Sequence, residues 1–351
     1  MGLKEKLVAA VFAAAWTACA LAQQPPAPEP PVVLKFHTHV AESSMQWQMM
    51  LKPWMDRIET QSNGRLRFER FAAMGFGGEP DELYEQVSNG AVDVVWARTD
   101  LVKNQFNRIE VFELPFMMTT PSAVSRALWE YVETYAADEF KDVQLLGLSV
   151  QGEGVVHTRR KSIQGVDDFK GLRLQSTPRL MGVYAELLGS QVVDSTETDT
   201  AQALSEGAID GLIDTWDSAG PLRAERFIQR HTVFGAKTGA LFTRTFLLAM
   251  NPTRYDSLPD DLKAIVDANT GSELSAEFGT VEQEHASAQR NRLLGGTEPG
   301  ALTVIDEEAA QAFRKASLKV DQVWLEELKE LGYDGQTLLD GARTLIKQQT
   351  K

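Results

Sequence analysis

The chain has 351 residues, of which 43% are hydrophobic and 24% charged, and its formal net charge is -14. The length exceeds what one compact core usually takes and suits two lobes, while the composition excludes a fibrous or wholly disordered chain. The excess of acidic residues argues against nucleic acid as a partner, because a surface that follows phosphates needs an excess of Lys and Arg.

The N-terminal segment has the pattern of a secretory signal. Lys4 and Lys6 precede an apolar run from Leu7 to Trp16, and the small residues of Ala20–Ala22 then provide a cleavage site. The run is shorter than the roughly 20 apolar residues of a spanning helix. We therefore expect a signal peptide over residues 1–22, a periplasmic location and no stable membrane insertion of the mature chain.

Cys19 is the only cysteine and offers an alternative, a lipid-anchored mature N-terminus. Ala18 before it is suitably small, but Trp16 occupies a position where an aliphatic residue is expected. Cleavage after Ala22 is therefore favoured. The mature chain then has no cysteine, and with it no disulfide, no thiolate metal site and no cysteine nucleophile.

Residues 23–32 are rich in proline and are expected to form an extended, exposed leader, with the fold beginning near its end. Strand and helix patterns then alternate along the chain. The predicted elements are strands over Val33–Phe36, Arg65–Glu69 and Val92–Trp96, a helix that Ser43 and Ser44 cap and that runs through Ile58, and a short helix over Asp81–Val87. This alternation predicts an α/β layered sheet.

One short pattern occurs twice, in Ser88–Asp93 and in Ser205–Asp210. Each contains a glycine that can take the left-handed conformation which ends a helix, and an apolar strand with a tryptophan, Trp96 or Trp216, follows it. One interpretation is a turn common to α/β proteins. The other is two lobes of similar topology whose strand ends face a shared cleft, where ligands of α/β sheets usually bind.

The second part of the chain contains further long elements. Two stretches are predicted to be strands that link the lobes, namely Val143–Val150 with Gly154–His157, and Gly239–Met250. Two helical regions follow, Asp261–Leu294 with interruptions and Asp306–Ile346 with breaks at Gly332 and Gly341.

No catalytic constellation is visible. His-Glu-x-x-His, Gly-x-Ser-x-Gly and the phosphate-binding Gly-x-x-x-x-Gly-Lys motif are all missing, so no catalytic residue is expected and the chain is not predicted to be an enzyme. His37 and His39 lie two residues apart on a strand, but no third ligand stands at a plausible spacing, and no metal site is expected.

Some histidines and tryptophans are candidates for other roles. His39, just past the first strand, is a candidate ligand contact, whereas His157 follows an apolar run and is expected to be buried and hydrogen-bonded. Trp96 and Trp216 end the two similar strands. Each has two interpretations, core packing or a flat wall of a solute pocket, where aromatic surface orients an organic ligand.

An ordered set of segments carries a family resemblance: Phe36–His37, Glu113–Phe116, Gly154–Thr158, Asp167–Leu174, Gly207–Gly211 and Tyr255–Pro259. Their order and spacing resemble the substrate-binding proteins of tripartite ATP-independent periplasmic (TRAP) transporters, over nearly all of the mature chain. The resemblance implies an α/β, two-lobed periplasmic-binding-protein-like fold with hinge strands and a long helix spanning both lobes. The first lobe would take residues 33–150 with part of 240–351, and the second 151–240 with part of 250–351.

The same resemblance implies what the protein binds. A small organic solute, favoured to be a carboxylate, would lie between the lobes and pass to the membrane subunits of the transporter, and no cofactor is needed. The family's site arginine, in the strand after a Gly-Leu-Lys motif, holds a ligand carboxylate in a bidentate way. Here that arginine falls on Gln175, which carries no charge.

Two alternatives follow from Gln175. Arg179, four residues on, would hold the anion in its place, whereas Arg173 matches a family lysine and is expected to point outward or toward the hinge. Alternatively the solute is an amine or a neutral polar molecule. Acidic and aromatic side chains would then hold it by charge pairing and cation–π contact, namely Glu153, Asp194, Asp214 and Asp217 with Trp96 and Trp216. A sensor-feeding binding protein and a secreted enzyme remain as rivals.

Overall fold

The computed structural model describes residues 30–176, 178–193, 199–216, 226–235, 237–295 and 300–350. The predicted signal peptide, Cys19 and nearly all of the proline-rich leader lie outside these residues. Within the described part, no helix is both long enough and apolar enough to cross a membrane.

The first sheet has the strand order β2-β1-β3-β10-β4. Its strands are β1 (Val32–Thr38), β2 (Leu66–Phe71), β3 (Val94–Arg98), β4 (Gln144–Val150) and β10 (Thr245–Met250). β1 is parallel to β3, while β10 is antiparallel to both β3 and β4. The ends of β1, β3 and β4 therefore share one edge with the start of β10. We call this sheet and the helices packed on it the first lobe.

The second sheet has the order β11-β9-β5-β8-β6-β7. Its strands are β5 (Gly154–Thr158), β6 (Arg173–Ser176), β7 (Gln191–Val192), β8 (Gly211–Thr215), β9 (Arg230–Phe234) and β11 (Leu302–Ile305). β6 is parallel to β7 and β8, and β5 is antiparallel to β8 and β9. The ends of β6 and β8 thus share an edge with the start of β5. This sheet and its helices form the second lobe.

The α-helices are α2 (Lys52–Gln61), α3 (Leu83–Ser88), α4 (Pro121–Tyr131), α5 (Arg179–Leu187), α6 (Thr200–Glu206), α7 (Pro252–Asp256), α8 (Asp260–Asp267), α9 (Ser272–Gly295), α10 (Glu307–Glu330) and α11 (Gly335–Gln349). Shorter turns are η2 (Gln46–Leu51), η3 (Pro80–Glu82), η4 (Ile109–Glu113), η5 (Val132–Ala136), η6 (Ala137–Phe140) and η7 (Val166–Phe169). α2 packs on one face of the first sheet through Trp54 and Phe36, whose ring centroids lie 6.5 Å apart.

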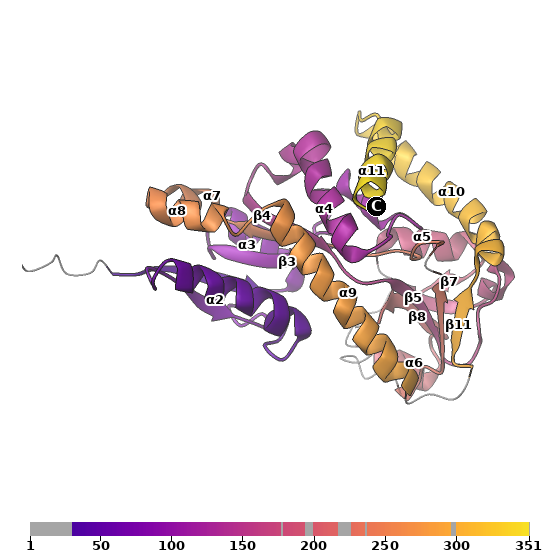
Figure 1. The fold of residues 1–351 in the computed structure, drawn as a ribbon. Helices are drawn as coiled ribbons and strands as arrows, with labels where there is room; N and C mark the ends of the chain where they lie inside the picture. Colours follow the sequence, from indigo (N-terminus) through magenta and orange to yellow (C-terminus); the bar gives the residue numbers. More distant parts are fainter. Residues whose placement is uncertain are drawn as a thin grey trace, which may run out of the picture. The chain divides into compact units, whose positions relative to one another are not determined.

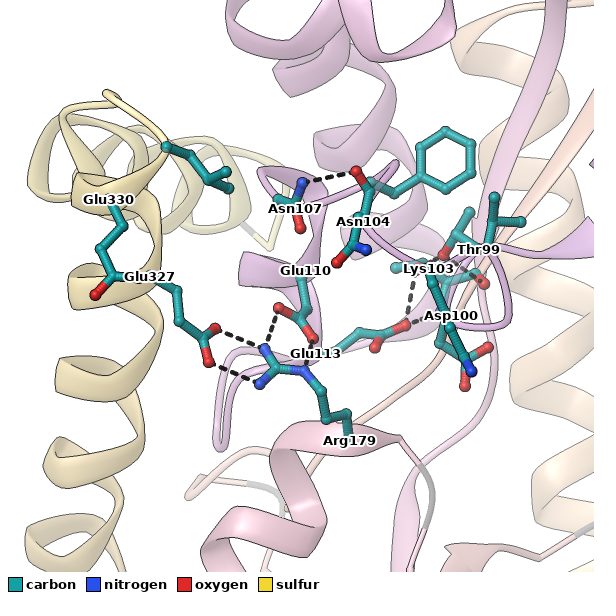
Figure 2. A pocket seen from close by; sticks show the side chains of 14 residues that line it. Thr99, Asp100, Lys103, Asn104, Asn107, Glu110, Glu113, Arg179, Glu327 and Glu330 are labelled. Carbon is teal, nitrogen blue, oxygen red and sulfur yellow. Dashed lines mark hydrogen bonds and ion pairs between the residues drawn. The ribbon is translucent and has the colours of Figure 1, made fainter.

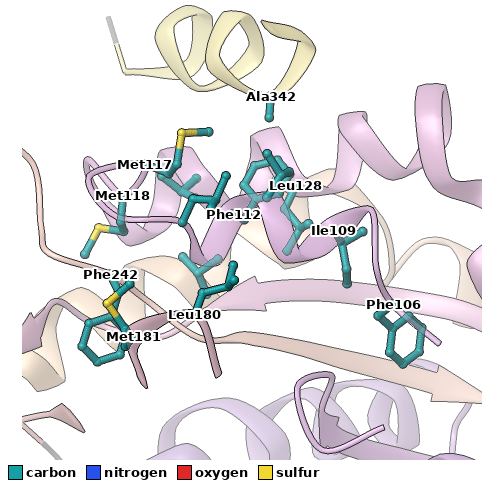
Figure 3. Packing of buried hydrophobic residues seen from close by; sticks show 14 of the residues in the cluster. Phe106, Ile109, Phe112, Met117, Met118, Leu128, Leu180, Met181, Phe242 and Ala342 are labelled. Atoms are coloured by element: carbon teal, nitrogen blue, oxygen red, sulfur yellow. The ribbon is translucent and has the colours of Figure 1, made fainter. Parts of the chain in front are cut away.

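One hydrophobic core runs through both lobes. Phe112 and Leu128 of the first lobe belong to the same buried cluster as Leu180 and Met181 at the start of α5, and Ala342 of α11 closes it (Figure 3). A second cluster lies in the second lobe, around Trp216. Burial of apolar side chains therefore holds the two lobes together as well as each one separately.

Two chain segments cross between the sheets and hydrogen-bond to each other. The first, Gln151–Glu153, leads from β4 to β5, and the second returns from β9 to β10. Gly154 N donates to Phe242 O at 2.9 Å, Gln151 N to Arg244 O at 3.0 Å, and Thr243 Oγ1 to Gln151 O at 2.7 Å. These paired crossover segments bring the facing edges of the two sheets together.

α9 is the third connection. It begins beside β4, where Ser275 Oγ accepts from Leu148 N, and it ends beside α6, where Leu293 joins the second cluster (Figure 1). The helix passes very close to the crossover: a Cβ on Gly152 would lie 2.4 Å from Cβ of Ala286. The α/β class, the linking segments and the long helix agree with the sequence prediction.

Several local predictions also have outcomes. Gly90 and Gly207 take positive φ angles of 81° and 73° after α3 and α6, as the repeated pattern predicts. The predicted break at Gly341 is wrong, because this residue lies inside α11, where a Cβ would come within 2.8 Å of Tyr135. The predicted long strand Gly239–Met250 is a strand only from Thr245, since its first part pairs with the crossover.

Candidate functional site

The edge of the first sheet that faces the second sheet carries two buried arginines, and each is paired with an aspartate. Arg98 ends β3 and donates to Asp100, from Nε to Oδ1 at 2.9 Å and from Nη2 to Oδ2 at 2.6 Å. Arg244 directly precedes β10, and its Nη1 lies 2.7 Å from Oδ1 of Asp214 in β8. The Arg244–Asp214 pair therefore joins the edge of the first sheet to the edge of the second.

Three aromatic rings are stacked beside these pairs. Trp96 of β3 lies against Phe246 of β10, with ring centroids 4.4 Å apart and planes within 7°. On its other face lies His39, which follows β1, at 5.6 Å and 8°. The strands β1, β3 and β10 are neighbours in the sheet, and this places the three side chains in a row. His39 ends the row and is only partly buried.

Two polar atoms in this stack are buried without a hydrogen-bond partner among the described residues, Nε1 of Trp96 and Nδ1 of His39. Leaving such a group unpaired costs about 1–3 kcal/mol, so native proteins rarely do so without a reason. Burial, and then the charge of Arg98, lowers the pKa of His39 to about 4. The imidazole is therefore neutral at pH 7, and both rings can serve a ligand as neutral partners.

The second edge contributes polar groups of its own. Gln175 of β6 is buried, and its Oε1 accepts from Thr200 Oγ1 at 2.5 Å. Ser176 Oγ and Thr215 Oγ1, at the ends of β6 and β8, are buried atoms that lack a partner among the residues described. Gln175 thus lies on the edge that the sequence predicts for the site, one strand away from Asp214.

Trp216, which follows β8, and Glu153, which precedes β5, lie together on this edge. Nε1 of Trp216 donates to Glu153 Oε1 at 3.0 Å, and Arg290 of α9 lies 3.6 Å from the same oxygen. The Trp216 ring packs against His157 and His231 with centroids 5.5 and 5.3 Å away. Of its two interpretations, core packing is the one that these contacts favour.

Arg179 lies elsewhere. As the first residue of α5, it holds Glu110 of η4 at 2.8 Å and Glu327 of α10 at 2.8 Å (Figure 2). Partial burial lowers the pKa of Arg179, but the two ion pairs outweigh burial and raise it. Arg179 lines a cavity of about 560 Å³ whose lining does not include Trp96, His39 or Gln175.

This cavity, which we call the Arg179 cavity, also includes residues at the first edge. Asp100 and Glu113 line it, and Glu113 Oε1 accepts from Thr245 N at 2.9 Å and Thr245 Oγ1 at 2.8 Å. Burial, and then the nearby Asp100, raises the pKa of Glu113 to about 8. Burial alone would raise the pKa of Asp100 as well, but Arg98 outweighs it and lowers that pKa. At pH 7 Asp100 is therefore ionised and Glu113 is protonated.

The structure thus separates the sequence-predicted residues into groups. His39 and Trp96 lie together on the first edge, and Gln175 lies on the second, while Arg179 lies apart from them. Asp194 and Asp217 lie outside the described residues. Sequence reasoning did not select Arg98 and Arg244, although each arginine stands at the end of an apolar run that is visible in the sequence.

The prediction that His157 is buried and hydrogen-bonded is confirmed. His157 is fully buried, and its Nδ1 lies 2.7 Å from Nδ1 of His231. His37 Nδ1 lies 2.7 Å from Gln86 Oε1. No cluster of three or more His, Cys, Asp or Glu side chains within the described ranges could hold a metal ion.

Comparison with known proteins gives a family match over most of the chain. Residues 36–327 match the model for Bacterial extracellular solute-binding protein, family 7. Among curated proteins, the Outer membrane transporter protein TsaT of Comamonas testosteroni is 23% identical over 311 residues, which cover 88% of this chain and 89% of that protein.

Two solved structures are similar in both sequence and fold. A TRAP solute binding protein from Rhodoferax ferrireducens T118, in complex with copurified benzoate, is 41% identical, with a TM-score of 0.85 over 91% of this chain and 98% of that chain. A TRAP solute binding protein from an unidentified marine microbe, with co-crystallised 3-hydroxybenzoate, is 30% identical, with a TM-score of 0.87 over 92% and 100%.

Proposed function

Because the chain belongs to the bacterial extracellular solute-binding proteins of family 7, we propose that it binds an aromatic carboxylate between its lobes and delivers it to the membrane subunits of a TRAP transporter. The place of action is the periplasm. The relatives that are 41% and 30% identical carry benzoate and 3-hydroxybenzoate, and both solutes are small aromatic acids.

The observation that carries the proposal is the pair of buried arginines on the first edge. A guanidinium presents its N–H donors in a fork that matches a carboxylate. Arg98 and Arg244 both lie on the first edge, and Arg244 joins it to the second edge through Asp214. They take the role that the family arginine at the position of Gln175 would otherwise have, and Trp96 Nε1 is a further donor for the same carboxylate.

The aromatic stack accounts for the ring of the solute. Phe246, Trp96 and His39 present a row of parallel rings whose outer member is only partly buried. An aromatic acid can extend this row in an offset stack, an arrangement worth about 0.5–1.5 kcal/mol beyond the area that it buries. An aliphatic acid of the same size cannot make this stacking interaction and lacks its contribution to the binding free energy.

The same geometry argues against an amine. Asp100 and Asp214 each lie against an arginine, so neither is an uncompensated charge for an ammonium group. The family is one of solute-binding proteins rather than enzymes. A binding protein that feeds a sensor would have the same pocket, and solute uptake by cells separates the two roles.

Thermal unfolding of the purified protein with benzoate, 3-hydroxybenzoate, cyclohexanecarboxylate and benzylamine tests the proposal. A ligand at one hundred times its Kd adds about 2.7 kcal/mol of stability, which raises the midpoint by several degrees. We expect a clear shift with both aromatic acids, a smaller one with the cyclohexane acid and none with benzylamine. A shift with benzylamine alone would contradict the proposal.

A further inference from the structure

A groove with a volume of about 540 Å³ shares no lining residue with the Arg179 cavity, and we call it the α10–α11 groove. Its walls come from the loop after η4, from the middle of α10 and from the last turns of α11. The side chains that matter for its chemistry are Phe116, Arg314, Leu318, Arg343 and Lys347. None of them belongs to the proposed solute site.

The walls of the groove are packed on different lobes. α10 is anchored to the second lobe by Phe313, whose ring lies 5.1 Å from Phe234 of β9 and whose carbonyl accepts from Tyr184 of α5. α11 packs instead along α4 of the first lobe, where Gln349 donates to Glu130. The two walls are also joined directly, because Arg343 of α11 holds Asp321 of α10 at 2.8 Å.

The groove also borders the returning crossover segment. Phe116 N donates to Leu241 O at 3.1 Å, and Arg314 Nη2 donates to Thr238 O at 2.5 Å. Phe116 has a positive φ of 64°, which is rare for a bulky residue and indicates a conformation fixed by its surroundings. Hydrogen bonds to the crossover segment therefore fix the position of this wall of the groove.

The charge of the groove is opposite to that of the whole chain. Three cations line it, and Asp321, which Arg343 holds at 2.8 Å, is the acidic residue in the lining. Lys347 is exposed and makes no ion pair with any described residue. Leu318, which also lines the groove, is 56% exposed. A basic, partly apolar groove on a chain of net charge -14 complements an acidic segment with an apolar side chain.

We propose that the α10–α11 groove docks an acidic, extended segment of the transporter's membrane subunit. The inference rests on the proposed function for the identity of the partner. The groove recognises the partner by charge through Lys347 and Arg343 and by apolar contact through Leu318.

Two measurements test the groove. The first is fluorescence anisotropy of a labelled peptide of alternating Glu and Leu, with the purified protein and with phosphatidylglycerol vesicles as the competing anionic surface. The second is benzoate uptake by the native bacterium carrying each variant in place of the wild type. The variants are Lys347→Glu and Leu318→Glu, and the matched control is Lys319→Glu, an exposed lysine of α10 outside the groove.

We expect both groove variants to weaken peptide binding and uptake by about tenfold or more while benzoate affinity in calorimetry stays unchanged. The control variant should behave as the wild type. Wild-type uptake by Lys347→Glu, an equal loss in the control, or binding to vesicles but not to the peptide would overturn the proposal. Groove-dependent peptide binding without any benzoate binding would support the groove and contradict the assigned solute instead.

Discussion

At the scale of single residues, the two buried arginines differ in what they connect. Arg98 and Asp100 lie in the same loop and strand end, so their pair can persist whatever the angle between the lobes. Arg244 and Asp214 lie on different sheets, and their pair forms only when the two edges meet. In the proposed site, Arg98 is therefore in place for a carboxylate whether the lobes are open or closed. The position of Arg244 depends on closure of the lobes.

Replacing Arg98 with lysine keeps the charge but loses the planar fork. We expect Arg98→Lys to weaken benzoate binding by about tenfold to a hundredfold, because one ammonium cannot serve Asp100 and a ligand carboxylate in a bidentate way. Arg179→Lys is the matched variant, and we expect little change from it. Calorimetry decides between them, and the reverse order would restore Arg179 as the anchor.

The indole of Trp96 offers a second test at this scale. Trp96→Phe keeps a stacked ring and removes the unpaired N–H, so benzoate affinity should fall by about threefold to tenfold. Trp54→Phe is the control, since its Nε1 already donates to Asn269 O at 2.9 Å. That variant should lower thermal stability and leave affinity unchanged. Equal affinities for both variants would remove Trp96 from the solute site.

At the scale of elements, how much the sequence predicts depends on the range of the interaction. The alternation of strands and helices and the glycine turn before β8 follow from local pattern, and the structure has them. The role of Arg244 does not, because it depends on a partner in another sheet that no spacing along the chain reveals. The predicted helix break at Gly341 fails for the same reason. Glycine is needed there because Tyr135 of another element leaves no space for a Cβ, and not because the helix ends.

The crossing of α9 over Gly152 gives a prediction for an element. Gly152→Ala places a Cβ 2.4 Å from Ala286, so we expect a loss of about 1–3 kcal/mol in the free energy of unfolding. Gly165→Ala is the matched control, since nothing lies within 4 Å of its added Cβ. Urea unfolding at constant slope measures both variants. Equal midpoints would mean that α9 shifts without cost.

At the scale of the whole molecule, stability should depend on pH through the buried carboxyl of Glu113. Its folded pKa of about 8 exceeds the unfolded value of 4.5, so the folded state binds more protons between these limits. The contribution of Glu113 is full below the unfolded value and is lost as pH rises through about 8.

Glu113→Gln keeps an oxygen for Thr245 and removes the titration. We expect the wild-type melting temperature to fall relative to the variant, by several degrees, as pH rises from 5 to about 8. Above that value the difference should stay constant. Parallel curves across the range would show that Glu113 is ionised in the folded protein or that Asp100 takes the proton in its place.

The paired crossover segments have a mechanical consequence. Because Gln151 and Gly154 are hydrogen-bonded to the returning segment at Arg244 and Phe242, the two links form one two-stranded ribbon rather than two separate tethers. Such a ribbon bends and twists readily but resists stretching, since lengthening it would strain covalent geometry or break its cross-links. The two lobes can therefore rotate about this ribbon as a hinge, while the distance that the ribbon spans stays constant.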